Sequence, residues 1–110
     1  MKVSAHFDSK EFESHDGAKS PYPRVVRVEL LNELEKVRIA YGKPLLVTSG
    51  YRSPAYNKKV GGVPNSYHCQ GLAADIVPAN RRDLKLVQKI ALTEVVCGGV
   101  GLYDTFVHID

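Results

Sequence analysis

Apolar residues recur every three or four positions between residues 24 and 41, with polar side chains between them. This spacing predicts an amphipathic helix from Arg24 to about Tyr41, with one face packed on a core. Gly42 would end that helix, and Pro44 would prevent it from resuming. The predicted core stripe consists of Val26, Leu30, Leu34, Val37 and Tyr41.

A second amphipathic helix is predicted after Asn80, whose side chain can cap its first turn. Two shorter helical segments are predicted from their caps. Asp8 and Glu11 fit a capping box, with Phe7 placed to pack on Phe12. Ser53 is a predicted N-cap followed by Pro54, for a helix that runs through Lys59. The buried stripe of the helix after Asn80 would consist of Leu84, Val87, Ala91 and Val95.

Four short apolar segments are predicted as strands, namely 45–48, 73–77, 98–103 and 106–110. The last two would be joined by a turn near residues 104–105. Because helices come early and also lie between strands, we expect an α+β fold with a small, mostly antiparallel sheet. The breakers within 14–23 predict a loop there. The chain of 110 residues is expected to form a single domain, 1–110.

Composition and charge narrow the class of protein. The chain is 44% hydrophobic and 25% charged, which is ordinary for a soluble domain. No apolar run approaches the roughly 20 residues that span a bilayer, so no membrane span is expected. Residues 1–6 lack the apolar segment of a secretory signal, so we expect synthesis in the cytoplasm. A net charge of +3 favours approach to an anionic polymer but is too small and scattered to indicate nucleic acid.

Candidate metal ligands are concentrated in residues 66–75, where His68 and Asp75 are seven positions apart with Gly71 between them. This spacing does not fit one helix face, but it fits a loop followed by a strand, with glycine allowing the turn. With His108 they form a ligand set that suits zinc with one open position. The alternative is a surface histidine and an ordinary aspartate. Cys69 is a further possible ligand, although a free thiol is the favoured interpretation.

These residues also carry a resemblance to a known family. Ser-x-His-x-x-Gly-x-Ala-x-Asp at 66–75, followed by Phe-Val-His-x-Asp at 106–110, resembles the zinc D-alanyl-D-alanine carboxypeptidases. Relatives of that family include phage endolysins that cut the L-alanyl-D-glutamate bond, and hedgehog signalling domains share its fold. The segments 49–53, 57–62 and 98–103 match the same pattern in order. The resemblance covers the chain from about residue 30 to the end.

The resemblance implies a hedgehog/DD-peptidase-like fold and one zinc ion per chain, held by His68, Asp75 and His108. Such an ion would keep a water molecule and lower its pKa toward about 7. The implied activity is hydrolysis of peptidoglycan stem peptides, as a D,D-carboxypeptidase or as an endolysin-type endopeptidase. The matching arginine, Arg52, is implied in substrate binding, where a guanidinium offers two donors. The alternative is a surface arginine at a helix start.

Four further residues complete the expected site. Ser66 is expected to hold the loop or contact substrate, although a plain turn serine fits equally well. Asp110 would share a strand face with His108 and fix the tautomer of a ligand histidine; otherwise it is an exposed aspartate. Asp104 is the expected general base, four residues before His108, although it also fits an ordinary turn. Tyr103 beside it is expected to contact substrate.

Two functional hypotheses follow. The first is a zinc peptidase that acts as a monomer on the cell wall, with a peptidoglycan peptide as its partner. A phage-encoded product released by phage lysis is the expected source. The second is a zinc-stabilised binding module of the same fold without catalysis. Cleavage of bacterial sacculi, with and without a chelator, distinguishes the two.

Overall fold

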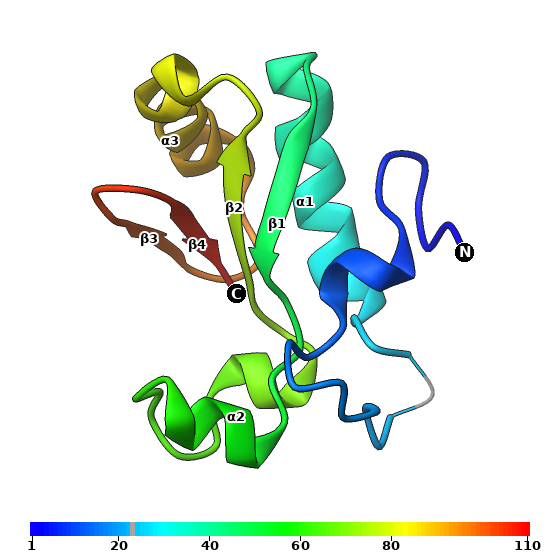
Figure 1. Cartoon of the computed structure of the whole chain (residues 1–110). Coiled ribbons are helices and arrows are strands. Elements are labelled where there is room, and N and C mark those ends of the chain that lie inside the picture. The colour runs from blue at the N-terminus through cyan, green and yellow to red at the C-terminus, as the bar shows by residue number, and fades with distance from the viewer. Residues whose placement is uncertain (23) are drawn as a thin grey trace.

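A four-stranded antiparallel sheet forms the centre of the molecule, in the order β1-β2-β4-β3 (Figure 1). The computed structural model describes residues 1–22 and 24–110. The antiparallel sheet with helices packed against it confirms the predicted α+β class. The strands are β1 (Leu45–Ser49), β2 (Ala74–Pro78), β3 (Val100–Leu102) and β4 (Val107–Ile109).

The two longer helices, α1 (Val28–Tyr41) and α3 (Leu84–Glu94), pack against each other and against the sheet (Figure 1). The short helix α2 (Pro54–Lys59) lies at the end of the sheet where β1 finishes and β2 begins. Three 3-10 turns complete the described elements: η1 (Ser9–Phe12), η2 (Tyr67–Gln70) and η3 (Arg81–Asp83). Within residues 1–22 and 24–110, no helix combines the length and apolar character needed to cross a bilayer.

The hydrophobic core lies between the sheet and the pair α1 and α3. All five residues of the predicted first stripe are buried, from Val26 to Tyr41. They pack with Ile76 of β2 and with both apolar residues of β4. Each fully buried aliphatic side chain contributes about 1.5–3 kcal/mol relative to exposure. The core therefore fixes the sheet that carries two of the candidate ligands.

Two predicted helix starts are wrong. Helix α1 begins at Val28 rather than Arg24. The backbone amide of Arg27 donates instead to the Gly71 carbonyl, 2.9 Å away, so this segment runs along the candidate metal loop. Helix α3 begins at Leu84, because Asn80 caps the separate turn η3 before it.

The predicted caps of the short helices are confirmed. Asp8 and Glu11 form the expected capping box on η1, and the rings of Phe7 and Phe12 lie 6.0 Å apart. The Ser53 hydroxyl caps α2 by accepting from the Tyr56 amide. The predicted loop contains no helix or strand over residues 14–22, and Pro23 lies outside the described residues.

A row of four residues crosses the sheet, one from each strand. Ser49 of β1 pairs with Asp75 of β2, Asp75 with His108 of β4, and His108 with Gly101 of β3. Side chains at paired positions lie on the same face, and neighbours along a strand lie on the other. Since Ile76 enters the core, this row faces away from α1 and α3. The face opposite the core therefore holds an aspartate and a histidine side by side.

Candidate metal centre

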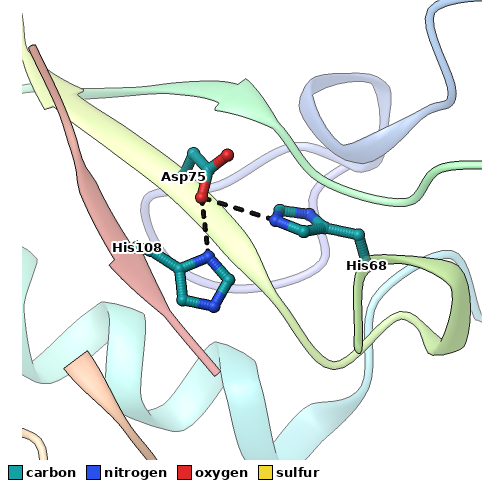
Figure 2. A group of neighbouring side chains, drawn as sticks. All are labelled: His68, Asp75 and His108. Carbon is teal, nitrogen blue, oxygen red and sulfur yellow. Dashed lines mark hydrogen bonds and ion pairs between the residues drawn. The ribbon is translucent and has the colours of Figure 1, made fainter. Parts of the chain in front are cut away.

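His68, Asp75 and His108 come together in the folded chain, as predicted from the sequence (Figure 2). One possible ligand atom of each lies within 4.8 Å of the others. Asp75 Oδ1 is 2.8 Å from His108 Nδ1 and 3.4 Å from His68 Nε2. His68 and Asp75 are buried, at 3% and 6% exposure, and the His108 side chain is 21% exposed.

The loop before β2 places His68 on this face. Ser66 caps the turn η2, and its hydroxyl accepts from the His68 amide at 3.1 Å. Gly71 ends the turn with φ +69°, a left-handed conformation that glycine adopts without strain. A Cβ on Gly71 would also lie 3.1 Å from the Val25 carbonyl oxygen. Ser66 therefore holds the loop, and a contact with substrate stays a prediction.

Each histidine has its second nitrogen held by an acceptor. His68 Nδ1 lies 2.8 Å from the Gly50 carbonyl oxygen, and His108 Nε2 lies 2.9 Å from Asp110 Oδ2. The Gly50 carbonyl oxygen only accepts, so the His68 ring carries a proton on Nδ1. Both nitrogens of His108 face a carboxylate, Asp110 Oδ2 and Asp75 Oδ1, so this ring can donate to either. With the proton of His108 on Nε2, toward Asp110, His68 Nε2 and His108 Nδ1 would be the nitrogens available to a metal.

Asp110 itself is held by Gly98 and Gly99, which lie in a segment predicted as a strand. Asp110 Oδ1 accepts from the Gly99 amide at 3.0 Å, and the two residues also exchange backbone hydrogen bonds. A Cβ on Gly98 would lie 1.8 Å from the Asp110 carbonyl oxygen. Asp110 is thus held against His108, in the geometry expected for a residue that orients a ligand.

The electrostatics of the cluster favour a cation. Burial alone would raise the pKa of Asp75, but hydrogen bonds from His108 and His68 outweigh it and lower that pKa to about 2. The hydrogen bond with Asp75 raises the pKa of His108 above its ordinary value, although burial opposes this. The carboxylate is therefore charged at neutral pH, between two imidazoles.

The donor set and its spacing fit zinc. Two histidine nitrogens and one carboxylate oxygen are the three protein ligands typical of a catalytic zinc site with an open fourth position. Ligands at about 2.1 Å in tetrahedral geometry lie about 3.4 Å from one another. The 3.4 Å separation of His68 Nε2 and Asp75 Oδ1 matches this spacing, and the 2.8 Å separation of Asp75 and His108 needs only a small widening.

Arg52 lies beside the three ligands rather than on the surface. Its side chain is 18% exposed, and its Nη2 is 3.5 Å from Asp75 Oδ2. Its Nε donates to Ser49 Oγ at 3.1 Å, and its Nη1 donates to Asn57 Oδ1 at 3.3 Å. A Cβ on Gly62 would lie 2.0 Å from the same Asn57 oxygen, which gives the segment 57–62 a structural role. The site partners Ser49 and Asn57 were not predicted individually.

Tyr103 lies next to the cluster, and Asp104 does not. A Cβ on Gly101 would lie 3.0 Å from Tyr103 Cε2 and 3.3 Å from His108 Cβ, so the tyrosine ring lies beside the ligand. Asp104 is exposed in the turn between β3 and β4, where it lines a pocket with Pro78 and Arg81. Its position therefore gives no support to the expectation that it acts as the general base.

Cys69 is also not brought into the cluster. Within the described part of the chain, the group of possible ligands contains only the two histidines and Asp75. The thiol instead borders a pocket with Asn57 and Asn65, and burial raises its pKa. A protonated thiol outside the group does not compete for a metal.

A buried carboxylate between two oriented imidazoles, with an arginine alongside, has the construction of a metal-dependent hydrolase centre. The family model for peptidase M15 matches residues 4–110, so the chain belongs to this family. It is also 33% identical over 81 residues to the zinc D-Ala-D-Ala carboxypeptidase of Streptomyces albus G. The match covers 70% of this chain but 32% of that relative, so it spans about a third of the relative's length.

Proposed function

We propose that this chain is a zinc-dependent peptidase that hydrolyses stem peptides of peptidoglycan. The observation that carries the proposal is the grouping of His68, Asp75 and His108, with Arg52 3.5 Å from the carboxylate. Membership of the peptidase M15 family supports the reaction class. The name of the Streptomyces relative supports a substrate that ends in D-alanyl-D-alanine.

His68 Nε2, Asp75 Oδ1 and His108 Nδ1 are the atoms that would hold the zinc. When bound, the ion would supply Lewis acidity and an activated water for attack on a peptide carbonyl. The chain's contribution is to keep both rings in the ligating tautomer, through the Gly50 carbonyl and Asp110. Such partners make the ligand set rigid before any metal arrives.

Arg52 is the residue that would bind the substrate. Its guanidinium is permanently charged and offers paired donors that match a carboxylate or a developing oxyanion. Ser49 and Asn57 hold it on two sides, so little side-chain entropy would be lost on binding. Tyr103 would form a wall of the same site beside His108.

The proposal extends to two kinds of bond and to a place of action. A D,D-carboxypeptidase would use Arg52 on the terminal carboxylate of the stem peptide, and an endolysin-type endopeptidase would use it on the peptide within the polymer. In either case the enzyme would act on the cell wall, and its net charge of +3 would favour approach to that anionic polymer. A phage-encoded protein released during lysis is one source that fits this action.

One observation favours a second candidate, a metal-stabilised binding module without catalysis. The expected base, Asp104, is exposed in a turn rather than at the cluster.

Mass spectrometry of purified bacterial sacculi incubated with the protein distinguishes the peptidase from the binding module. New peptide termini that disappear with chelator and return with zinc support the peptidase, and His108→Ala should produce none. Zinc-dependent binding to sacculi without any new terminus would support the module.

A further inference from the structure

The turn that carries Arg52 is held by three hydrogen bonds to two other parts of the chain. The Tyr51 amide donates to the Phe12 carbonyl at 2.8 Å, and the Arg52 amide donates to the His68 carbonyl at 3.1 Å. The Ser53 amide donates to Ser14 Oγ at 3.1 Å. Two of these three acceptors come from the N-terminal segment, so that segment sets the position of the turn.

Asp16 ties this N-terminal segment to the start of α2. Its Oδ2 accepts from the Ser53 hydroxyl at 2.5 Å, and its Oδ1 accepts from the Ser14 hydroxyl at 2.7 Å. The same Oδ1 also accepts from the Ala18 amide at 3.0 Å. The Ser53 hydroxyl in turn accepts from the Tyr56 amide. One carboxylate therefore joins both serines that flank the arginine turn.

These hydrogen bonds are of the strong kind. An ionised carboxylate that accepts from a hydroxyl forms a shorter and stronger bond than two neutral groups do. The bond from the Ser53 hydroxyl, followed by the one from Ser14, lowers the pKa of Asp16 to about 2. Both serines are buried, at 6% and 4% exposure, although Asp16 is itself exposed. The connection is therefore charged throughout the neutral range.

The N-terminal segment and the arginine turn are closely packed. A Cβ on Gly50 would lie 2.6 Å from the Phe12 Cα, so η1 packs directly on the residue whose carbonyl orients His68. On the other side of Asp16, His15 Nδ1 lies 3.1 Å from the Tyr56 hydroxyl. Movement of residues 12–16 would consequently move Arg52.

We propose that Asp16, acting through Ser14 and Ser53, is a positioning residue that fixes Arg52 for the substrate. Asp16 lies in the loop predicted over residues 14–23, and hydrogen bonds to Ser53 join that loop to the arginine turn. The inference rests on the proposed function for its catalytic consequence. Its structural part, that Asp16 fixes the position of Arg52, can be tested without any enzymatic activity.

The first arm of the test observes Arg52 directly. The ¹⁵N NMR signal of Arg52 Nε–H reports its hydrogen bond to Ser49, independent of turnover. In zinc-loaded protein, Asp16→Ala and Ser53→Ala should shift or broaden this signal, and Ser53→Thr, which keeps the hydroxyl, should restore it. Asp83→Ala removes a carboxylate of η3 that accepts from the Tyr41 hydroxyl and serves as the matched control, with the signal unchanged. Zinc content should stay at one ion per chain in all four variants.

The second arm uses release of peptide termini from sacculi. Asp16→Ala should lower kcat/KM about tenfold or more, the range expected for loss of a charge-assisted hydrogen bond. In an Arg52→Ala background, the same change should have no further effect, because both act through one group. Asp83→Ala should behave like the wild type.

Two results would overturn the inference. One is an unchanged Arg52 signal in both Asp16→Ala and Ser53→Ala; the other is an equal loss of rate from Asp16→Ala with and without Arg52. If Asp16→Ala does not fold, the pair Ser53→Ala and Ser53→Thr decides in its place. If the wild type cleaves nothing, the proposed function fails, and the NMR arm still decides whether Asp16 positions Arg52.

Discussion

Asp75 and His108 are direct partners across β2 and β4, with Asp75 Oδ1 2.8 Å from His108 Nδ1. Sheet register alone thus supplies two of the three candidate ligands, and the loop before β2 adds His68. A slip of one residue in β4 would turn His108 into the core and Val107 toward the metal face. The apolar residues that flank both ligands therefore stabilise the site as well as the fold.

Asp110 is expected to strengthen zinc binding without touching the ion. Asp110→Asn replaces the carboxylate oxygen that holds His108 Nε2 with an amide and should weaken zinc affinity about 10–100-fold. Isothermal titration with zinc, in the presence of a competing chelator, measures the change. Far-UV circular dichroism should remain that of the wild type. A zinc affinity within twofold of that of the wild type would contradict a role for Asp110 in orienting His108.

Arg52 is expected to act on substrate and not on the metal. Arg52→Lys keeps the charge but loses the planar pair of donors, so activity on sacculi should fall while zinc content stays at one per chain. Release of peptide termini and elemental analysis measure the two quantities. Arg82→Lys, an exposed arginine, is the matched control. Equal kcat/KM for the Arg52 variant and the control would place Arg52 outside the substrate site.

Two substitutions distinguish the contributions of Asp104 and Tyr103 to the rate of cleavage. Because Asp104 is exposed in the turn, Asp104→Asn should leave the rate of cleavage near that of the wild type. Tyr103→Phe should lower the rate if its hydroxyl polarises the substrate beside His108. A loss of about a hundredfold or more in Asp104→Asn would show that the turn folds over the site and supplies the general base.

The pKa shifts predict opposite effects of pH on the protein with and without zinc. The raised pKa of His108 contributes stability below its ordinary value of 6.5, which is lost as pH rises through the higher folded value. The lowered pKa of Asp75 contributes stability above 3.8, which is lost only as pH falls through about 2. Chelator-treated protein should therefore lose Tm as pH rises above about 6.5.

Zinc competes with the proton on His108, so the Tm increase caused by zinc should grow over the same range. Calorimetry at a series of pH values between 5 and 8 measures both curves. A zinc effect that is constant across this range would contradict the assignment of His108 as a ligand.

Much of this arrangement is predictable from the sequence because local rules act at the decisive places. The cap at Ser53 and the turn at Gly71 are set by short-range sterics and hydrogen bonds. The three ligand types and the stripe of α1 are likewise visible in the residue pattern. These features suffice to place the sheet and the cluster.

The remaining features depend on contacts between distant segments, which the pattern does not encode. The Gly50 carbonyl that orients His68 is a backbone group and has no side-chain signal. Glu33 lies off the apolar stripe of α1, yet it is 3% exposed and its carboxylate accepts from the Val96 amide. The role of Asp16 likewise appears only when the loop meets α2. The start of α1 shifts because the Gly71 carbonyl competes for the Arg27 amide.

The zinc content of three variants tests the central claim most directly. Elemental analysis of protein dialysed against a limiting chelator should give one zinc per chain for the wild type and for His6→Ala, a histidine outside the cluster. His68→Ala and His108→Ala should each retain less than about a tenth of that amount, because a lost ligand weakens binding more than a lost orienting partner does. One zinc per chain in both cluster variants would contradict a metal held by His68, Asp75 and His108.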